Sequence, residues 1–171
     1  PSTTASYTST IFWWLSLPAS EASLRQSFSK RLASSSDMST SLRATLTAAR
    51  HLAEGHRLVV AFQPLPWSRT AIFHRELGEA LGLADDVVVL EVYGSNEEPI
   101  PGASGALVAA AVPLPPDHVL FEQSFSAVPA WLAERAAPGD LVLTLGDGIV
   151  STLGPEVVDL LRARAARAGG P

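Results

Sequence analysis

The chain has 171 residues, of which 47% are hydrophobic and 17% charged, and this composition predicts one globular domain with a substantial core. The formal net charge is −5 and the basic residues are spread along the chain, which argues against nucleic acid as a partner. The absence of cysteine excludes disulfides, thiolate nucleophiles and Cys-ligated zinc, and it favours a cytoplasmic location.

The first 39 residues differ in composition from the rest. Residues 1–39 are rich in Ser and Thr and lack a regular hydrophobic period, so we predict a divergent, poorly ordered leader, with the folded domain in residues 40–171. Small residues follow the apolar run from Ile11 to Leu17, as in a secretory signal, but no basic residue precedes it, and a signal peptide is the less favoured interpretation. The run is far shorter than the roughly 20 residues that cross a bilayer, so no membrane span is predicted.

Regular periodicity begins after Ser39. Residues 42–55 predict a helix, because Leu42, Leu46 and Ala49 share one face and Gly55 can end it. Four strand-type apolar runs follow, each leading into a helical pattern: strands at 57–62, 86–93, 118–122 and 140–145, and helices at 70–82, 104–112, 126–139 and 154–168. Strands without polar alternation, each followed by a helix, indicate an α/β domain with a doubly wound, mostly parallel, Rossmann-like sheet and helices on both faces.

Ligands in such sheets bind beyond the carboxyl ends of the strands. Arg69 lies in the loop that follows the first predicted strand, at the start of a helix whose free N–H groups also favour an anion. We therefore predict that Ser68, Arg69 and Thr70 bind a carboxylate or phosphate. An equally weighted alternative is that Arg69 pairs with a nearby acid, Glu97 or Glu98.

Three further residues belong to the loops at this predicted edge: Gln63, Gly146 and Gly148. The last two lie in "GDGIVS", which stands between a strand and a helix as a dinucleotide fingerprint does. Ser151 replaces the third glycine, and no acidic residue follows at the required distance in a second βαβ strand, so NAD binding is disfavoured. The preferred interpretation is a tight turn that needs glycine.

No metal or catalytic site is predicted. The four histidines lack metal-ligand spacing: His51, His56, His74 and His118. Glu97 and Glu98 could hold a metal or an amine, but adjacent acids in a Pro-rich loop are usually solvated. Trp67 and Trp131 are interpreted as packing residues. Lys30 is the only lysine and has no glycine nearby, so no P-loop can be built in this chain.

Longer motifs carry a family resemblance. From Arg43 to about Leu161 the chain resembles the C-terminal domain of the Mur ligases, through "LRATLTAAR", "VVAFQP" with "SRT", "EALGLADDVVVLEVY", "EEPIPGASGALVAA", "VPAWLAERAAPGDLVLTLG" and "LGPEVVDLL". The resemblance implies a three-domain ligase of peptidoglycan synthesis. It also implies that ATP and Mg²⁺ phosphorylate the carboxylate of UDP-N-acetylmuramate, after which the amine of L-alanine attacks the acyl phosphate.

In that family the third domain closes over the ATP site and helps to bind the incoming amino acid. This chain resembles only the third domain, so the resemblance implies N-terminal and central ligase domains as missing partners. We expect the chain alone to bind neither ATP nor Mg²⁺ and to be inactive, because it contains no P-loop.

The chain departs from the family pattern at the sites that matter for function. The family opens this region with an Asp-Tyr-Ala-His-His-Pro-Thr-Glu type motif, of which only Thr40 matches within "SSSDMSTS". In the loop that usually reads Phe-Gln-Pro-His-Arg-Tyr-Ser-Arg-Thr, Leu65, Pro66 and Trp67 replace the His, Arg and Tyr. Ile149 takes the place of the acid in Gly-Ala-Gly-Asp.

Two questions stay open from the sequence. The similarity collapses immediately before Leu42, which fits a frameshifted, truncated or decayed ligase copy as well as a diverged leader. The function is either that of a ligase domain or that of a noncatalytic α/β module that binds a small anion or a partner domain.

Overall fold

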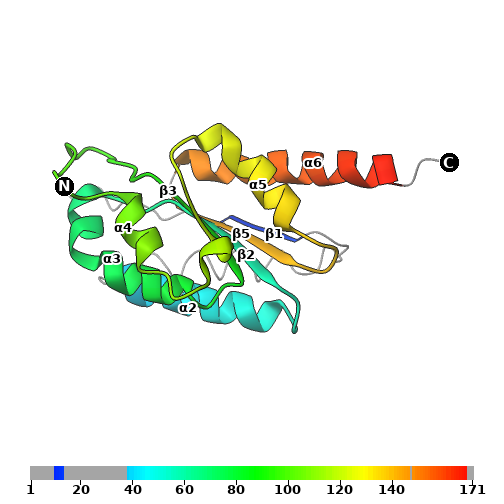
Figure 1. The fold of residues 1–171 in the computed structure, drawn as a ribbon, viewed down its shortest axis with the longest axis horizontal. Coiled ribbons are helices and arrows are strands. Elements are labelled where there is room, and N and C mark those ends of the chain that lie inside the picture. The colour runs from blue at the N-terminus through cyan, green and yellow to red at the C-terminus, as the bar shows by residue number, and fades with distance from the viewer. Residues whose placement is uncertain (1–9, 14–37, 147, 169–171) are drawn as a thin grey trace, which may run out of the picture.

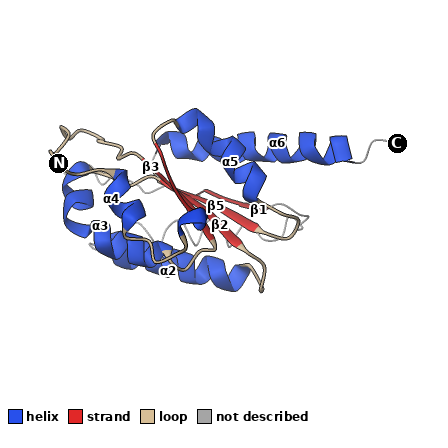
Figure 2. Ribbon diagram, in the orientation of Figure 1, coloured by secondary structure: helices blue, strands red, loops and turns tan. Residues whose placement is uncertain are grey.

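A computed structural model describes residues 10–13, 38–146 and 148–168. Four parallel strands form the centre of the sheet: β2 (Leu58–Phe62), β3 (Asp86–Leu90), β4 (Val119–Glu122) and β5 (Leu141–Leu145). The strand order is β1-β5-β2-β3-β4, with β1 (Thr10–Trp13) antiparallel to β5. Figure 2 shows these strands between two layers of helices, which confirms the predicted α/β class and the mostly parallel sheet.

Among the described residues, five α-helices and three short 3-10 helices flank and connect the strands. The α-helices are α2 (Met38–Leu52), α3 (Trp67–Leu81), α4 (Gly105–Ala110), α5 (Val128–Arg135) and α6 (Leu153–Ala168). The 3-10 helices are η2 (Pro116–His118), η3 (Phe125–Ala127) and η4 (Gly148–Thr152). In Figure 1, α2, α3 and α4 lie on one side of the sheet and α5 and α6 on the other.

Two apolar clusters fill the spaces between the layers. Every residue of β2, β3 and β5 is buried, because both faces of the sheet are covered. Successive residues face opposite sides: Val60 packs in the cluster with α2, α3 and α4, whereas Val59 packs in the cluster with α5 and α6. The predicted apolar face of α2 is confirmed, because Leu42, Leu46 and Ala49 are all buried.

Helix boundaries differ from those predicted, and the starts of α3 and α6 have a physical reason. Helix α3 begins at Trp67, three residues before the predicted start at residue 70, because Pro66 is extended and its carbonyl already accepts the Thr70 amide at 3.0 Å. Helix α6 begins at Leu153, so Pro155 is its third residue and lies within the first turn, where a missing amide costs no hydrogen bond.

The sequence analysis predicts no strand before residue 40, and β1 is therefore a difference. Residues Thr10–Trp13 pair with the edge of β5 from Thr10 opposite Thr144 to Trp13 opposite Leu141. Their β-branched and aromatic composition suits a strand, and the edge of β5 offers unpaired backbone groups. The remainder of the predicted leader, residues 1–9 and 14–37, lies outside the described residues. The boundary drawn at residue 39 therefore stays a prediction.

Candidate functional site

The candidate site is the edge at which β2, β3, β4 and β5 end. The four strands are parallel and in register, so their carboxyl ends meet at one edge of the sheet. Gln63 follows β2 directly, Gly146 follows β5 directly, and Gly148 begins η4. Ser68 and Arg69 lie in the first turn of α3. The structure thus places all of these predicted residues on the strand-to-helix connections of the predicted edge.

Gln63 links the ends of three strands. Its side chain is buried, its backbone N–H donates to the Leu145 carbonyl at 2.8 Å, and its Nε2 donates to the Glu91 carbonyl at 3.2 Å. Its Oε1 atom is buried and accepts no hydrogen bond, the one side-chain N or O atom of this kind among the described residues. Gln63 therefore has a structural role: it connects the end of β2 to the ends of β5 and β3, where a ligand is predicted to bind.

Gly146 is required by the backbone at this position. Its φ is +157°, and a Cβ atom there would lie 2.8 Å from Val150 Cγ2 and 3.1 Å from Gln63 Cβ. A side chain would thus push against both Gln63 and the turn into η4. This geometry agrees with the preferred interpretation of the glycines as residues of a tight turn.

A carboxylate of the chain already lies at the start of α3. Glu97 Oε2 accepts the Ser68 backbone N–H at 2.8 Å, and Glu97 Oε1 accepts the Ser68 hydroxyl at 2.7 Å. These two hydrogen bonds hold the pKa of Glu97 below its ordinary value. Burial opposes them, and the charge of Arg69 lowers the pKa by a lesser amount. The donors predicted for a ligand anion therefore bind an internal anion in this structure.

The other two residues of the predicted triplet behave differently. Arg69 is exposed, and its charge contributes to the lowered pKa of Glu97, in line with the alternative in which Arg69 interacts with a nearby acid. Thr70 is fully buried, and its hydroxyl donates to the Pro66 carbonyl at 2.9 Å. Thr70 thus shapes the turn, while Ser68 and Arg69 face the surface.

The loop between β3 and α4 is tied to the loop before α3. The Tyr93 N–H donates to the Pro64 carbonyl at 2.9 Å, and a Cβ atom on Gly94 would lie 2.7 Å from Trp67 Nε1. Together with the Glu97–Ser68 hydrogen bonds, these contacts lay residues 93–97 over the connection from β2 to α3. The indole of Trp67 is therefore a packing surface for this loop, as predicted.

The base of the same loop is fixed by Glu91. Its carboxylate accepts hydrogen bonds from the Val92 N–H at 2.9 Å, the Gly105 N–H at 2.8 Å and the Ser104 hydroxyl at 3.2 Å. Ser104 in turn caps α4 by accepting the Ala106 N–H at 3.1 Å. The two ends of the loop are thus held together beside the sheet.

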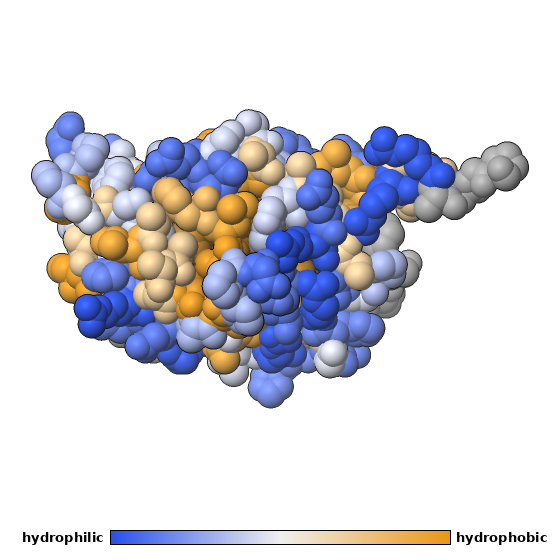
Figure 3. Space-filling model, viewed as in Figure 1, coloured by the Kyte–Doolittle hydropathy of each residue, from blue (hydrophilic) through white to orange (hydrophobic). Residues whose placement is uncertain are grey.

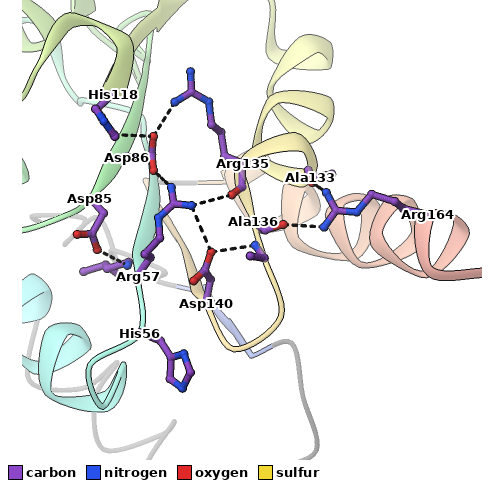
Figure 4. A network of polar contacts seen from close by, with 12 residues as sticks. His56, Arg57, Asp85, Asp86, His118, Ala133, Arg135, Ala136, Asp140 and Arg164 are labelled. Carbon is purple, nitrogen blue, oxygen red and sulfur yellow. Dashed lines mark hydrogen bonds and ion pairs between the residues drawn. The ribbon is translucent and has the colours of Figure 1, made fainter. Parts of the chain in front are cut away.

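A second polar network, at the opposite edge of the sheet, was missed by the sequence analysis. Asp86 begins β3 with no exposed side-chain surface, and its carboxylate binds Arg57 and, at 2.7 Å, Arg135. His118 Nδ1 lies 3.1 Å from the same carboxylate, and Arg57 also lies 3.8 Å from Asp140 (Figure 4). The sequence signal that could have revealed this network is the charged or ionisable residue at the start of each apolar run.

A shallow groove lies between α3 and α4, away from the strand ends. It encloses roughly 400 Å³ and is lined by His74, Arg75, Glu79, Leu107, Ala110 and Ala111. Figure 3 shows an apolar area over α4 on this face of the molecule, and Leu107 of α4 is exposed. The groove holds none of the predicted site residues.

ATP and Mg²⁺ are the cofactors that the resemblance implies for the whole enzyme. The structure describes no group of three acidic or histidine side chains that could hold a metal ion within residues 10–13, 38–146 and 148–168. Lys30, the single lysine, lies outside these residues. None of the helices in the part of the chain that the structure describes is long and apolar enough to span a membrane.

Comparison with known proteins identifies the family. The model of the Mur ligase, glutamate ligase domain matches residues 38–148, which include every parallel strand and the whole carboxyl edge. The chain belongs to the Mur ligase family. The predicted resemblance is thereby confirmed.

Curated relatives of this Mur ligase domain carry one name. The chain is similar to UDP-N-acetylmuramate–L-alanine ligases from Acidothermus cellulolyticus, with 59% identity over 73% of this chain, and Nocardioides sp., with 55% over 71%. The enzyme of that name from Mycobacterium tuberculosis is 48% identical over 75% of this chain. The aligned parts cover 26%, 27% and 26% of those proteins, so the chain spans about a quarter of their length.

A solved structure supports the fold. A domain from a Haemophilus ducreyi protein, assigned as a UDP-N-acetylmuramate:L-alanyl-gamma-D-glutamyl-medo-diaminopimelate ligase, matches with a TM-score of 0.53 and 18% identity. The match covers 72% of this chain and 83% of that domain. At this identity the likeness shows the three-layer architecture alone.

Proposed function

We propose that this chain is the C-terminal domain, as a fragment or a diverged copy, of a cytoplasmic UDP-N-acetylmuramate–L-alanine ligase of peptidoglycan synthesis. The observation that carries the proposal is 48–59% identity to ligases of that name over 71–75% of this chain. In this role the domain closes over the ATP site of a central domain and helps to bind the incoming amino acid. UDP-N-acetylmuramate, L-alanine and ATP are then shared with the N-terminal and central domains of the ligase.

Within this function, Ser68 and Arg69 form the anion-binding part of the domain. Arg69 is exposed beside the first turn of α3, at the edge where ligands bind in sheets of this class. The Ser68 N–H and hydroxyl point at a carboxylate in the present structure, which supports their fitness for an anion. Gln63, Gly146 and Gly148 border this part of the edge and shape it.

The chemistry of phosphoryl transfer belongs to the other domains of the ligase. A phosphate cradle, a lysine and a magnesium ligand are needed, and this sequence contains no P-loop around its single lysine. The domain therefore contributes closure and substrate placement. Misplacement of a substrate by about 1 Å can cost about 100-fold in rate, so this contribution is measurable.

A chimeric ligase tests the proposal. Residues 38–168 replace the matching quarter of the Acidothermus cellulolyticus enzyme, and phosphate release is followed with UDP-N-acetylmuramate, L-alanine, ATP and Mg²⁺. We expect turnover about 100-fold below that of the parent, because Leu65, Pro66 and Trp67 replace the His, Arg and Tyr of the family loop. Restoring these three residues in the chimera is expected to raise turnover at least tenfold.

Arg69→Met in the restored chimera is the matched control. If the restored chimera folds but turns over no faster than this variant, the domain places no substrate through Arg69. The alternative function, a noncatalytic module that binds a small anion or a partner domain, would then be favoured. The isolated chain is expected to release no phosphate in the same assay.

A further inference from the structure

Glu97 occupies the position in which the proposed function places a ligand anion. Its two carboxylate oxygens accept the Ser68 N–H at 2.8 Å and the Ser68 hydroxyl at 2.7 Å. Both donors are thereby used, and a carboxylate or phosphate from outside cannot bind them while Glu97 remains. The negative charge also lies close enough to Arg69 for their electrostatic interaction to lower the pKa of the Glu97 side chain.

The loop that carries Glu97 is held at its base and open toward its tip. Glu91 fixes the base through the Val92 and Gly105 amides, while residues 95–100 are all exposed. Ser95 has a φ of +56°, and the Glu97 N–H donates to the Gly94 carbonyl at 2.9 Å, so a tight turn presents Glu97 toward α3. Two hydrogen bonds from Ser68 hold the Glu97 side chain itself.

We propose that residues 93–97 form a clasp that closes the Ser68–Arg69 site, and that Glu97 must leave Ser68 before an external carboxylate or phosphate binds. This inference rests on the proposed function, because it concerns access to the same anion site. The clasp is a surface contact, and exposed charged contacts stabilise a structure only weakly, so a ligand anion can displace it. The clasp thus limits affinity without blocking the site.

Glu98 provides a matched control. It is the next residue, it is exposed, and it carries the same charge, but Ser68 donates its two hydrogen bonds to Glu97. Glu97→Gln and Glu98→Gln therefore remove the same net charge from the same loop. Only Glu97→Gln removes the resident carboxylate from the first turn of α3.

Backbone NMR titration of the full chain with N-acetyl-L-alanine, and separately with inorganic phosphate, tests the clasp. We expect shifts in Gln63 to Ile72, with the dissociation constant of Glu97→Gln about three- to tenfold lower than that of the unchanged chain, the size of one exposed charge contact or slightly more. Glu98→Gln is expected to change it less than twofold. The Ser68 amide shift, recorded without ligand, reports whether Glu97→Gln has released its donor.

The outcomes separate the clasp from the proposed function. If the unchanged chain and Glu97→Gln bind either anion equally, and Arg69→Met abolishes binding, the site exists and the clasp is wrong. If Glu97→Gln weakens binding, Glu97 positions α3 for the ligand, and the clasp is again overturned. If no variant binds an anion although the Ser68 amide has been released, the proposed anion site itself fails.

Discussion

The substitution Asp86→Asn is expected to lower the free energy of unfolding by about 3 kcal/mol. Asp86 begins β3, and its side chain is fully buried. Its carboxylate interacts with Arg57, the residue before β2, and with Arg135 at the end of α5. It also lies 3.1 Å from His118, which precedes β4. One carboxylate thus connects β2, β3, β4 and α5, and asparagine would keep its size but turn an NH₂ group toward guanidinium donors.

The magnitude follows from burial. Removing one partner of a buried charge pair costs about 3–5 kcal/mol, because the remaining charge is left unpaired. The side chains of Arg57 and Arg135 are 43% and 35% exposed, so water can take over part of their hydrogen bonding after the substitution. The lower end of the range is therefore expected, which corresponds to a decrease in Tm of about 10 °C for a domain of this size.

Chemical denaturation of the full chain, followed by circular dichroism, measures the effect. Asp159→Asn is the control, because Asp159 and Arg162 form a pair at 3.5 Å whose side chains are 78% and 72% exposed. We expect this control to cost less than about 0.5 kcal/mol. A loss for Asp86→Asn below about 1 kcal/mol, or one equal to that of the control, would refute the assignment of Asp86 as the central charge of the network.

Three further outcomes are expected. Burial raises the pKa of Asp85, but hydrogen bonds from Arg50 and the Leu58 amide and the nearby guanidinium charges lower it more. The pKa of Asp85 is thus lower in the folded state than in the unfolded chain. Its contribution to the free energy of unfolding is therefore complete above the unfolded pKa and is lost as the pH falls through the folded pKa. Between pH 7 and pH 3, chemical denaturation should show a smaller decrease in the free energy of unfolding for Asp85→Asn than for the unchanged chain. Gly105→Ala is expected to cost about 1–3 kcal/mol by calorimetry, because its Cβ would collide with the Leu90 carbonyl oxygen. Arg164→Ala is expected to cost about 1–3 kcal/mol in the same measurement, because its guanidinium donates to two carbonyls at the end of α5 at 2.5 and 2.6 Å.

The sequence predicts the central layers well because their signal is local. Short runs dominated by apolar residues predicted β2, β3 and β5, and each strand is buried along its whole length. The carboxyl edge follows from the order of strands and helices, since parallel strands end together. The positions of Gln63, Arg69 and Gly146 at that edge could therefore be anticipated from the sequence alone.

Contacts between distant residues could not be derived in the same way. Ser68 and Glu97 are 29 residues apart, and from the sequence Glu97 was one of two acids that could lie near Arg69. Strand β1 pairs with β5 across more than a hundred residues, and a four-residue apolar run carries no sign of its partner. The buried network around Asp86 depends on how four strand ends and a helix meet, which no local pattern encodes.

The hydrogen bonding of buried polar groups helps to distinguish a decayed ligase copy from a diverged one. Unselected substitutions place polar groups in apolar interiors, where an unpaired group costs about 1–3 kcal/mol. Among the described residues, Gln63 Oε1 is the one buried side-chain oxygen or nitrogen without a hydrogen bond. The family's His position is filled by Leu65, which is itself buried, and Trp67 packs against Gly94. The residues that depart from the family pattern in the loop before α3 are thus closely packed. This packing favours a diverged domain, in which the folded core was retained while the ligand loop changed, over a decayed copy.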